Sequence, residues 1–272
     1  MACRTVILML LAAAATGCGR EPVRTAVVPV ETPVPEVVPP ASETAAAPIP
    51  LGPQLVEFAT MISRQQTDVA RAGLQQYVEE HAGDGQAAFL LGLTYHREKR
   101  YTLARPWFES AAGLAPDYHP IHHFHGWCLY YLGDMPGARA AFERHLDVSP
   151  GEGDSHFALG LIALDQDRLD DAQRRFLQAI ELQQGNPRRQ RDVSKARARV
   201  ADVHIRRGDL QQARAELQLA TELWPQHYTA FYKLSRVLNR LGENDSADEA
   251  FRLYRQWQAR SEPRRGVPEP SS

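Results

Sequence analysis

The sequence predicts an all-α fold, a solenoid of helix–turn–helix repeats. The first observation is a periodic alanine, at intervals of 34 residues with one interval of 41: Ala70, Ala104, Ala138, Ala172, Ala213 and Ala247. The second is a Leu or Phe four residues after each alanine, which lies on the same face of a helix. The third is a glycine-centred turn inside three repeats: LGD at 132–134, RGD at 207–209 and LGE at 241–243. A fixed period of this length is typical of stacked repeats.

Small residues and prolines place the two helices of each repeat. A small residue lies twelve positions before the alanine in four repeats, at Gly92, Gly126, Gly160 and Ala201. Such residues let two helices approach closely, and the Leu or Phe fills the space between them. Proline ends three of the repeats because it cannot continue a helix. One repeat cannot bury its apolar stripe alone, so we expect the repeats to stack.

This pattern resembles the tetratricopeptide repeat. The clearest copy, residues 85–118, matches it at Leu91, Gly92, Tyr95, Ala104, Phe108, Ala111 and Pro116. Further copies span 119–152, 153–186, 194–227 and 228–261, and a degenerate copy spans 51–84. The resemblance implies a right-handed superhelix with a concave inner surface over residues 54–260.

Residues 1–17 are expected to be a bacterial lipoprotein signal peptide. The apolar run at 6–15 is too short to span a bilayer as a stable helix but suits a secretory signal. The sequence ATGC, ending at Cys18, resembles a lipobox, which implies that Cys18 becomes the lipidated N-terminus. An ordinary signal peptide with a coincidental cysteine is the alternative. Gly19 after the cysteine implies an outer-membrane location facing the periplasm.

Residues 18–53 are expected to form a disordered tether behind the lipid anchor. Nine prolines stand within 19–53, and proline favours an extended chain that forms no helix or sheet. The alternative is a polyproline ligand for the aromatic groove of a partner. Residues 261–272 have a similar character and are expected to be a disordered tail.

Charge and cysteine content narrow the classes of function. The net charge of −2 gives no bulk attraction to nucleic acid. Residues 51–186 carry a balance of −7 and residues 187–260 a balance of +6, which predicts an acidic and a basic end. Cys128 is the cysteine that remains in the repeats, so no intramolecular disulfide is expected there.

The stretch HPIHHFHGWC, residues 119–128, raises the question of a metal or haem site. His122 and His125 take repeat positions that usually hold packing residues, so we expect them to point inward. His119 and His123 share a helix face at i,i+4, as zinc ligands can, but the sequence offers no third ligand and no HExxH, CxxC or CxxCH motif. No metal and no cofactor are therefore predicted, and a metal or haem carrier using His119–His125 is the alternative.

The resemblance also implies a binding surface. In tetratricopeptide proteins the first helix of each repeat lines the inner groove. The corresponding partner-binding residues here are Phe89, His123, Trp127, Tyr130, Tyr131, Phe157, Arg206, Tyr232, Arg236 and Arg240. This groove would run from an aromatic half to an arginine-rich half, which favours an extended peptide with apolar side chains and an acidic end.

The interval of 41 residues marks an insertion within 185–207. Gly185 can end one helix, Asn186 can cap the next, and Pro187 suits a first helical turn. We expect the following helix to be about two turns longer than its counterparts. It would present a basic docking surface, or a merely solvated face, made of Arg188, Arg189, Arg191, Lys195, Arg197 and Arg199.

These features favour a binding protein over an enzyme. The sequence contains no nucleophile elbow, phosphate loop or HExxH motif, and no catalytic residue is predicted. We expect a non-enzymatic, membrane-anchored periplasmic scaffold or adaptor that binds a protein or peptide in its concave groove. Such lipoproteins also resemble pilotins, so a pilotin-type assembly factor for an outer-membrane secretin of type IV pili is the alternative.

Overall fold

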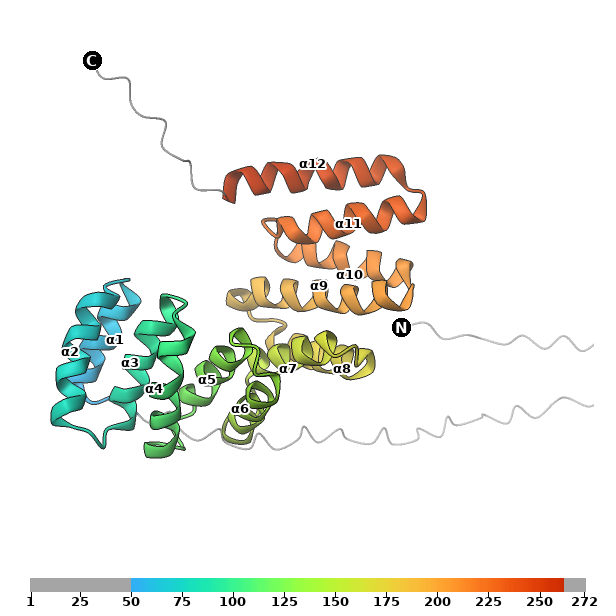
Figure 1. The fold of residues 1–272 in the computed structure, drawn as a ribbon. Coiled ribbons are helices and arrows are strands. Elements are labelled where there is room, and N and C mark those ends of the chain that lie inside the picture. Colours follow the sequence, from blue (N-terminus) through green and yellow to red (C-terminus); the bar gives the residue numbers. More distant parts are fainter. Residues whose placement is uncertain (1–49, 262–272) are drawn as a thin grey trace, which may run out of the picture. The chain divides into compact units, whose positions relative to one another are not determined.

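The structure, a computed structural model, describes residues 50–261, and within this range the regular structure is entirely helical (Figure 1). The all-α prediction is therefore confirmed. The helices are α1 Pro53–Ser63, α2 Thr67–Glu80, α3 Gly85–Arg97, α4 Tyr101–Leu114, α5 Pro120–Tyr131, α6 Met135–Val148, α7 Gly153–Asp165, α8 Leu169–Gln183, α9 Gln190–Arg207, α10 Leu210–Leu223, α11 Tyr228–Leu241 and α12 Asn244–Ser261, with a 3-10 turn, η1, at Pro187–Arg189.

The helices form six antiparallel pairs that follow one another along the chain (Figure 1). Each odd-numbered first helix packs against the second helix that follows it, and each second helix packs against the first helix of the next pair. The stack begins with α1 and α2 and ends with α12. Contacts between neighbouring helices therefore build the core, as in other repeat proteins.

Three phenylalanines fill the middle of the stack. Phe108, Phe142 and Phe176 have no exposed surface. Each ring lies against the glycine of its own pair, and a Cβ placed on Gly126 would lie 2.7 Å from the ring of Phe142. A Cβ on Gly160 would lie 2.6 Å from the ring of Phe176. The expectation that small residues admit the Phe between two helices is therefore confirmed.

The turn inside each pair uses one left-handed residue. The positive-φ residues recur with the period of the repeat, at Gln65, Lys99, Gly133, Asp167, Gly208 and Gly242. Glycine adopts this conformation without a steric penalty, whereas other L-residues are strained by it. The backbone geometry of the turn thus persists in three repeats that lack the glycine.

The seven-residue insertion extends α9, though less than expected. Gly185 has a φ of +81°, and the Asn186 side chain accepts a hydrogen bond of 3.0 Å from the backbone N–H of Arg188. Part of the insertion forms the 3-10 turn that follows. α9 has 18 residues, against 13 in α7 and 14 in α11, so the extension is shorter than the predicted two turns.

Several predictions concern residues outside the described range. The signal peptide 1–17, the lipidation of Cys18, nearly all of the tether 18–53 and the tail after Ser261 lie there. Within residues 50–261, no helix combines the length and the apolar character needed to cross a membrane.

Candidate functional site

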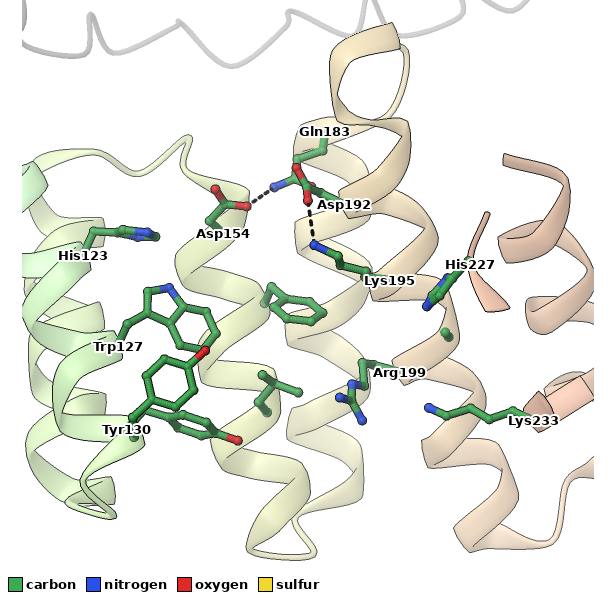
Figure 2. A pocket seen from close by; sticks show the side chains of 14 residues that line it. His123, Trp127, Tyr130, Asp154, Gln183, Asp192, Lys195, Arg199, His227 and Lys233 are labelled. Carbon is green, nitrogen blue, oxygen red and sulfur yellow. Dashed lines mark hydrogen bonds and ion pairs between the residues drawn. The ribbon is translucent and has the colours of Figure 1, made fainter. Parts of the chain in front are cut away.

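A pocket of about 640 Å³ lies among the first helices of four successive pairs. Figure 2 shows Trp127 and Tyr130 on one side of it, and Arg199, His227 and Lys233 on the other. Side chains of α5, α7, α9 and α11 supply most of its lining. The lining residues are His123, Trp127, Tyr130, Tyr131, Asp154, Phe157, Leu161, Gln183, Asp192, Lys195, Ala198, Arg199, His227 and Lys233.

The first wall of the pocket is aromatic. Trp127, Tyr130 and Tyr131 occur at i, i+3 and i+4 on α5, so the helix presents them together. The Trp127 ring lies 5.6 Å from the Tyr130 ring and 5.4 Å from the buried ring of Phe142, between ring centroids. Phe157 of α7 extends this wall. Trp127 therefore packs against the core through Phe142 and also lines the pocket.

A hydrogen bond fixes Tyr130 in this wall. Its hydroxyl donates to Oδ2 of Asp165, at the end of α7, over 3.0 Å. Burial, and then the contact with Asp165, raises the pKa of Tyr130 to about 12. The hydroxyl therefore stays protonated at neutral pH and keeps α5 linked to α7.

The opposite wall carries an excess of positive charge. Arg199 of α9 and Lys233 of α11 both contact Oδ2 of Asp202, at 3.1 Å and 2.7 Å. Two cations thus share one carboxylate, which leaves a net charge of +1. Burial lowers the pKa of Lys233, and the nearby Asp202 opposes this only in part. An additional anion in the pocket would offset this charge.

Carboxylates at the other end of the pocket are already balanced. Figure 2 shows that Asp154 accepts a hydrogen bond from Gln183 Nε2, which is 3.0 Å long. Arg189 lies 3.3 Å from the other oxygen of Asp154. Arg189 and Lys195 each lie 3.4 Å from Asp192. Two cations face two carboxylates, so this end is neutral. The unbalanced positive charge of the pocket therefore lies at Arg199 and Lys233.

His227 completes the cationic side as a neutral ring. The Ser194 hydroxyl lies 2.7 Å from the Ala220 carbonyl oxygen and 2.7 Å from His227 Nδ1. Because the carbonyl can only accept, Ser194 donates to it, and His227 Nδ1–H donates to Ser194. Burial, followed by the charges of Lys233 and other nearby cations, lowers the pKa of His227 to about 4. Its ring therefore adds no positive charge at neutral pH.

The structure brings half of the proposed partner-binding residues together. His123, Trp127, Tyr130, Tyr131 and Phe157 all line the pocket. The assignment of Phe89 to the groove is wrong. Phe89 is only 3% exposed, because rings from neighbouring segments cover it: Phe108, Tyr118 and Phe124.

The four remaining candidates lie outside the pocket. Arg206 donates to the Leu164 carbonyl oxygen at 2.5 Å and pairs with Asp167 at 3.2 Å, so it joins α9 to the end of α7. Tyr232 is 40% exposed and packs against Tyr254 of α12. The other two, on α11 with Tyr232, are Arg236 and Arg240.

The predicted basic docking helix does not form one surface. Lys195 and Arg199 line the pocket, while Arg197 points toward α10 and pairs with Glu216 at 2.9 Å. Arg191 lies over the ring of Trp224. Basic residues one or two positions apart face different sides of a helix, so the run divides. The remaining two precede α9, in the turn η1: Arg188 and Arg189.

Some lining residues lie at positions that the sequence pattern did not indicate. Asp154 is the second residue of its repeat and lies at the start of the first helix, α7. Gln183 ends a second helix, and His227 precedes α11. Asp192 lies in the inserted segment, and Lys233 lies one position beyond the groove position of Tyr232.

The histidine-rich stretch divides among several environments. His122 is 6% exposed and its Nε2 lies 2.7 Å from the Pro116 carbonyl oxygen, which confirms its inward packing. His125 is half-buried, and His123 lines the pocket. Between residues 50 and 261, no three His, Cys, Asp or Glu side chains converge as metal ligands would. Cys128 is buried, which raises the pKa of its thiol to about 11.

Comparison with sequence families gives one match over most of the chain. The profile described as tetratricopeptide repeat matches residues 62–119, 125–187 and 199–261. Among curated proteins, none matches the sequence.

Solved structures share the fold at low sequence identity. PilW, described as a widely conserved type IV pilus biogenesis factor, is 18% identical with a TM-score of 0.65, over 76% of this chain and 91% of that one. The pilF protein of Pseudomonas aeruginosa is 16% identical with a TM-score of 0.62, over 76% of this chain and 95% of that one. YrrB, described as having an unusual peptide-binding site, is 18% identical with a TM-score of 0.52, over 68% and 92%.

Proposed function

Since the chain belongs to the tetratricopeptide repeat family, we propose that it is a non-enzymatic scaffold that binds a peptide segment of a partner protein in the pocket among α5, α7, α9 and α11. The observation that carries this proposal is the pairing of an aromatic wall with a wall of unbalanced positive charge. Large aromatic side chains and arginine dominate the binding energy of many interfaces.

The two walls define the chemistry of the ligand. Trp127, Tyr130 and Phe157 offer apolar surface to an aromatic or large aliphatic side chain. Arg199 and Lys233, which share the single carboxylate of Asp202, offer their excess charge to a carboxylate. The ligand that fits both is a segment with a bulky apolar residue close to an Asp or Glu. The neutral carboxylate end of the pocket gives no comparable attraction to a cation.

The first test measures capture of partner proteins by variants of the full chain from detergent-solubilised membranes. Trp127→Ala should raise the dissociation constant of the captured partner by about 30-fold, which corresponds to about 2 kcal/mol of binding free energy. Trp257→Ala, on the distant helix α12, is the matched control and should leave capture unchanged. The helical circular dichroism signal of Trp127→Ala should persist. Unchanged capture by this folded variant would refute the pocket as the binding site.

A second test addresses the charge preference. Arg199→Gln should reduce capture roughly tenfold, and added salt should reduce it in the wild type. Arg252→Gln, which removes an exposed arginine from α12, is the control. If both variants bind equally well, the ligand has no anionic group at this place.

We place this scaffold at the bacterial cell envelope, lipid-anchored and facing the periplasm. The support is the lipobox-like sequence that ends at Cys18 and the proline-rich segment behind it. Cys18→Ser should abolish lipid attachment and release the protein from the membrane fraction. Continued membrane anchoring of that variant would contradict the lipidation.

A pilotin-type role in secretin assembly is the second candidate function. It is supported by the same lipobox-like sequence and proline-rich segment, and by the similarity to PilW, which is described as a type IV pilus biogenesis factor. Mass spectrometry of the captured proteins separates the two. A secretin that is lost with Trp127→Ala supports the pilotin role, whereas periplasmic hydrolases lost with the same variant support a general adaptor.

A further inference from the structure

Within residues 50–261, no other element covers the outer face of α12. This helix ends the row (Figure 1), and among its 18 residues only Ala247 and Ala250 are buried. Phe251 stands four residues after the periodic alanine, as Phe176 does in α8. Phe176 has no exposed surface, but Phe251 is 42% exposed.

A middle repeat shows what normally covers this face. Phe176 and Ile180 of α8 share one core cluster with Val193, Ala196 and Val200 of α9. On α12 the equivalent positions are Phe251 and Arg255, and within residues 50–261 no further helix follows to cover them. The last helix therefore has an aromatic side chain at a position that contacts the next helix in the middle repeats.

The exposed face of α12 carries opposite charges on either side of Phe251. Asp248, Phe251 and Arg255 are spaced at i, i+3 and i+7, which aligns them in one stripe. Neither Asp248 nor Arg255 forms an ion pair with another described residue. A surface hollow begins at Phe251 and extends toward the C-terminal end of α12. It is lined by Phe251, Tyr254, Arg255, Gln258 and Ala259.

We propose that α12 pairs with α12 of a second copy of this chain in an antiparallel, twofold arrangement. With the axis between residues 251 and 252, Asp248 of each copy lies level with Arg255 of the other. The two Phe251 rings then meet near the axis. The same patch serves both copies, as an isologous dimer requires. A parallel pairing would instead place like charges side by side.

The size of this face sets the strength of the contact. A helix of 18 residues is about 27 Å long, and with a width of about 10 Å it buries a few hundred Å² per copy. A standard stable interface buries about 800 Å² per partner. The dimer is therefore expected to be weak and to form where the local concentration is high.

The decisive experiment is a charge exchange in the full chain, followed by sedimentation velocity at rising concentration in detergent. Asp248→Arg or Arg255→Asp alone places like charges opposite each other twice per dimer and should weaken association about tenfold. The double variant carrying both changes restores opposite charges and should recover wild-type association. Recovery excludes misfolding and excludes dimers held only by the N-terminal segment. A wild-type chain that stays monomeric up to several hundred micromolar, or a double variant no better than the single ones, would overturn the proposal.

Disulfide trapping gives an independent measurement. Phe251→Cys places a thiol next to the proposed twofold axis, so oxidation should give a cross-linked dimer on a non-reducing gel. Leu219→Cys on α10 is the matched control, because Leu219 is 41% exposed and Phe251 is 42% exposed. Equal cross-linking of the two variants would contradict α12 as the contact.

Discussion

The middle repeats and the last repeat place the same residue type in opposite environments. Phe142 and Phe176 lie against Gly126 and Gly160 and have no exposed surface. The last repeat instead has Ser235 at the glycine position, and its Phe251 is 42% exposed. Ser235 is itself buried, with its hydroxyl donating to the Tyr232 carbonyl oxygen at 2.9 Å.

This difference shows that a repeat position acquires its packing from two neighbours. The glycine of the same pair makes room for the ring, and the first helix of the next pair covers it. In the part of the chain that the structure describes, the last repeat has neither the glycine nor a following helix, so its Phe does not join the core as its counterparts do. Terminal repeats in solenoids generally differ from internal ones for this reason.

The largest expected effect comes from removing a covered phenylalanine. Phe142→Ala should lower the free energy of unfolding by about 3–5 kcal/mol, because it leaves a cavity between two helices. Phe251→Ala should lower it by less than about 1 kcal/mol. Urea denaturation of both variants measures the contrast, and similar losses would show that the last repeat is packed like the others.

Filling a glycine position should be the next most costly change. Gly160→Ala brings a Cβ to within 2.6 Å of the Phe176 ring and should cost about 1–3 kcal/mol. Gly113→Ala is the control, since a Cβ there meets nothing within 4 Å and alanine favours the helix. Thermal denaturation should show opposite shifts for the two variants. A stabilised Gly160→Ala would mean that the helices separate easily.

Acid should destabilise the repeats that contain buried histidines. Burial lowers the pKa of His96 and of His145 to about 4, below the ordinary value of 6.5, whereas α12 contains no histidine. The unfolded chain therefore binds protons first, and stability falls as the pH drops from about 6.5 toward 4.

The histidine contribution can be isolated by substitution. His145→Gln should flatten this pH dependence by up to about 1.4 kcal/mol per pH unit. Hydrogen exchange at pH 7 and pH 5 would locate the loss. Equal acid sensitivity of the wild type and His145→Gln would contradict a role for this buried ring.

The smallest effect separates the two causes of the exposure of Phe251. Ser235→Gly makes room for the ring but supplies no covering helix. We expect the free energy of unfolding to fall by about 0.5–1 kcal/mol, the usual cost of glycine in a helix. A rise in stability would instead show that Ser235 is what keeps Phe251 out of the core.

The fold could be predicted from the periodic residues of the sequence. Ala104, Phe108 and Gly92 recur because each contact is local to one repeat, so their spacing predicts the helix pairs directly. The turns were less visible. Gln65, Lys99 and Asp167 adopt the positive φ that is typical of glycine, and their residue types do not predict it.

The pocket could be predicted only in part, because its two walls depend on different kinds of information. Trp127, Tyr130 and Phe157 lie at fixed positions of the repeat, so the family pattern reaches them. Lys233 and Asp192 enter through packing between pairs and through the insertion, which periodicity does not describe. Phe89 failed as a binding residue for the same reason, since neighbouring rings cover it.

The left-handed turns at Gln65 and Lys99 also bear on how heat-tolerant this protein could become. A side chain at positive φ costs on the order of 1 kcal/mol, and neither residue lines the pocket. Glycine at both places would relax the backbone at the expense of a more flexible unfolded chain. The melting temperature should therefore have room to rise by a few degrees while ligand selectivity is untouched, which makes these two turns natural starting points for engineering a sturdier scaffold.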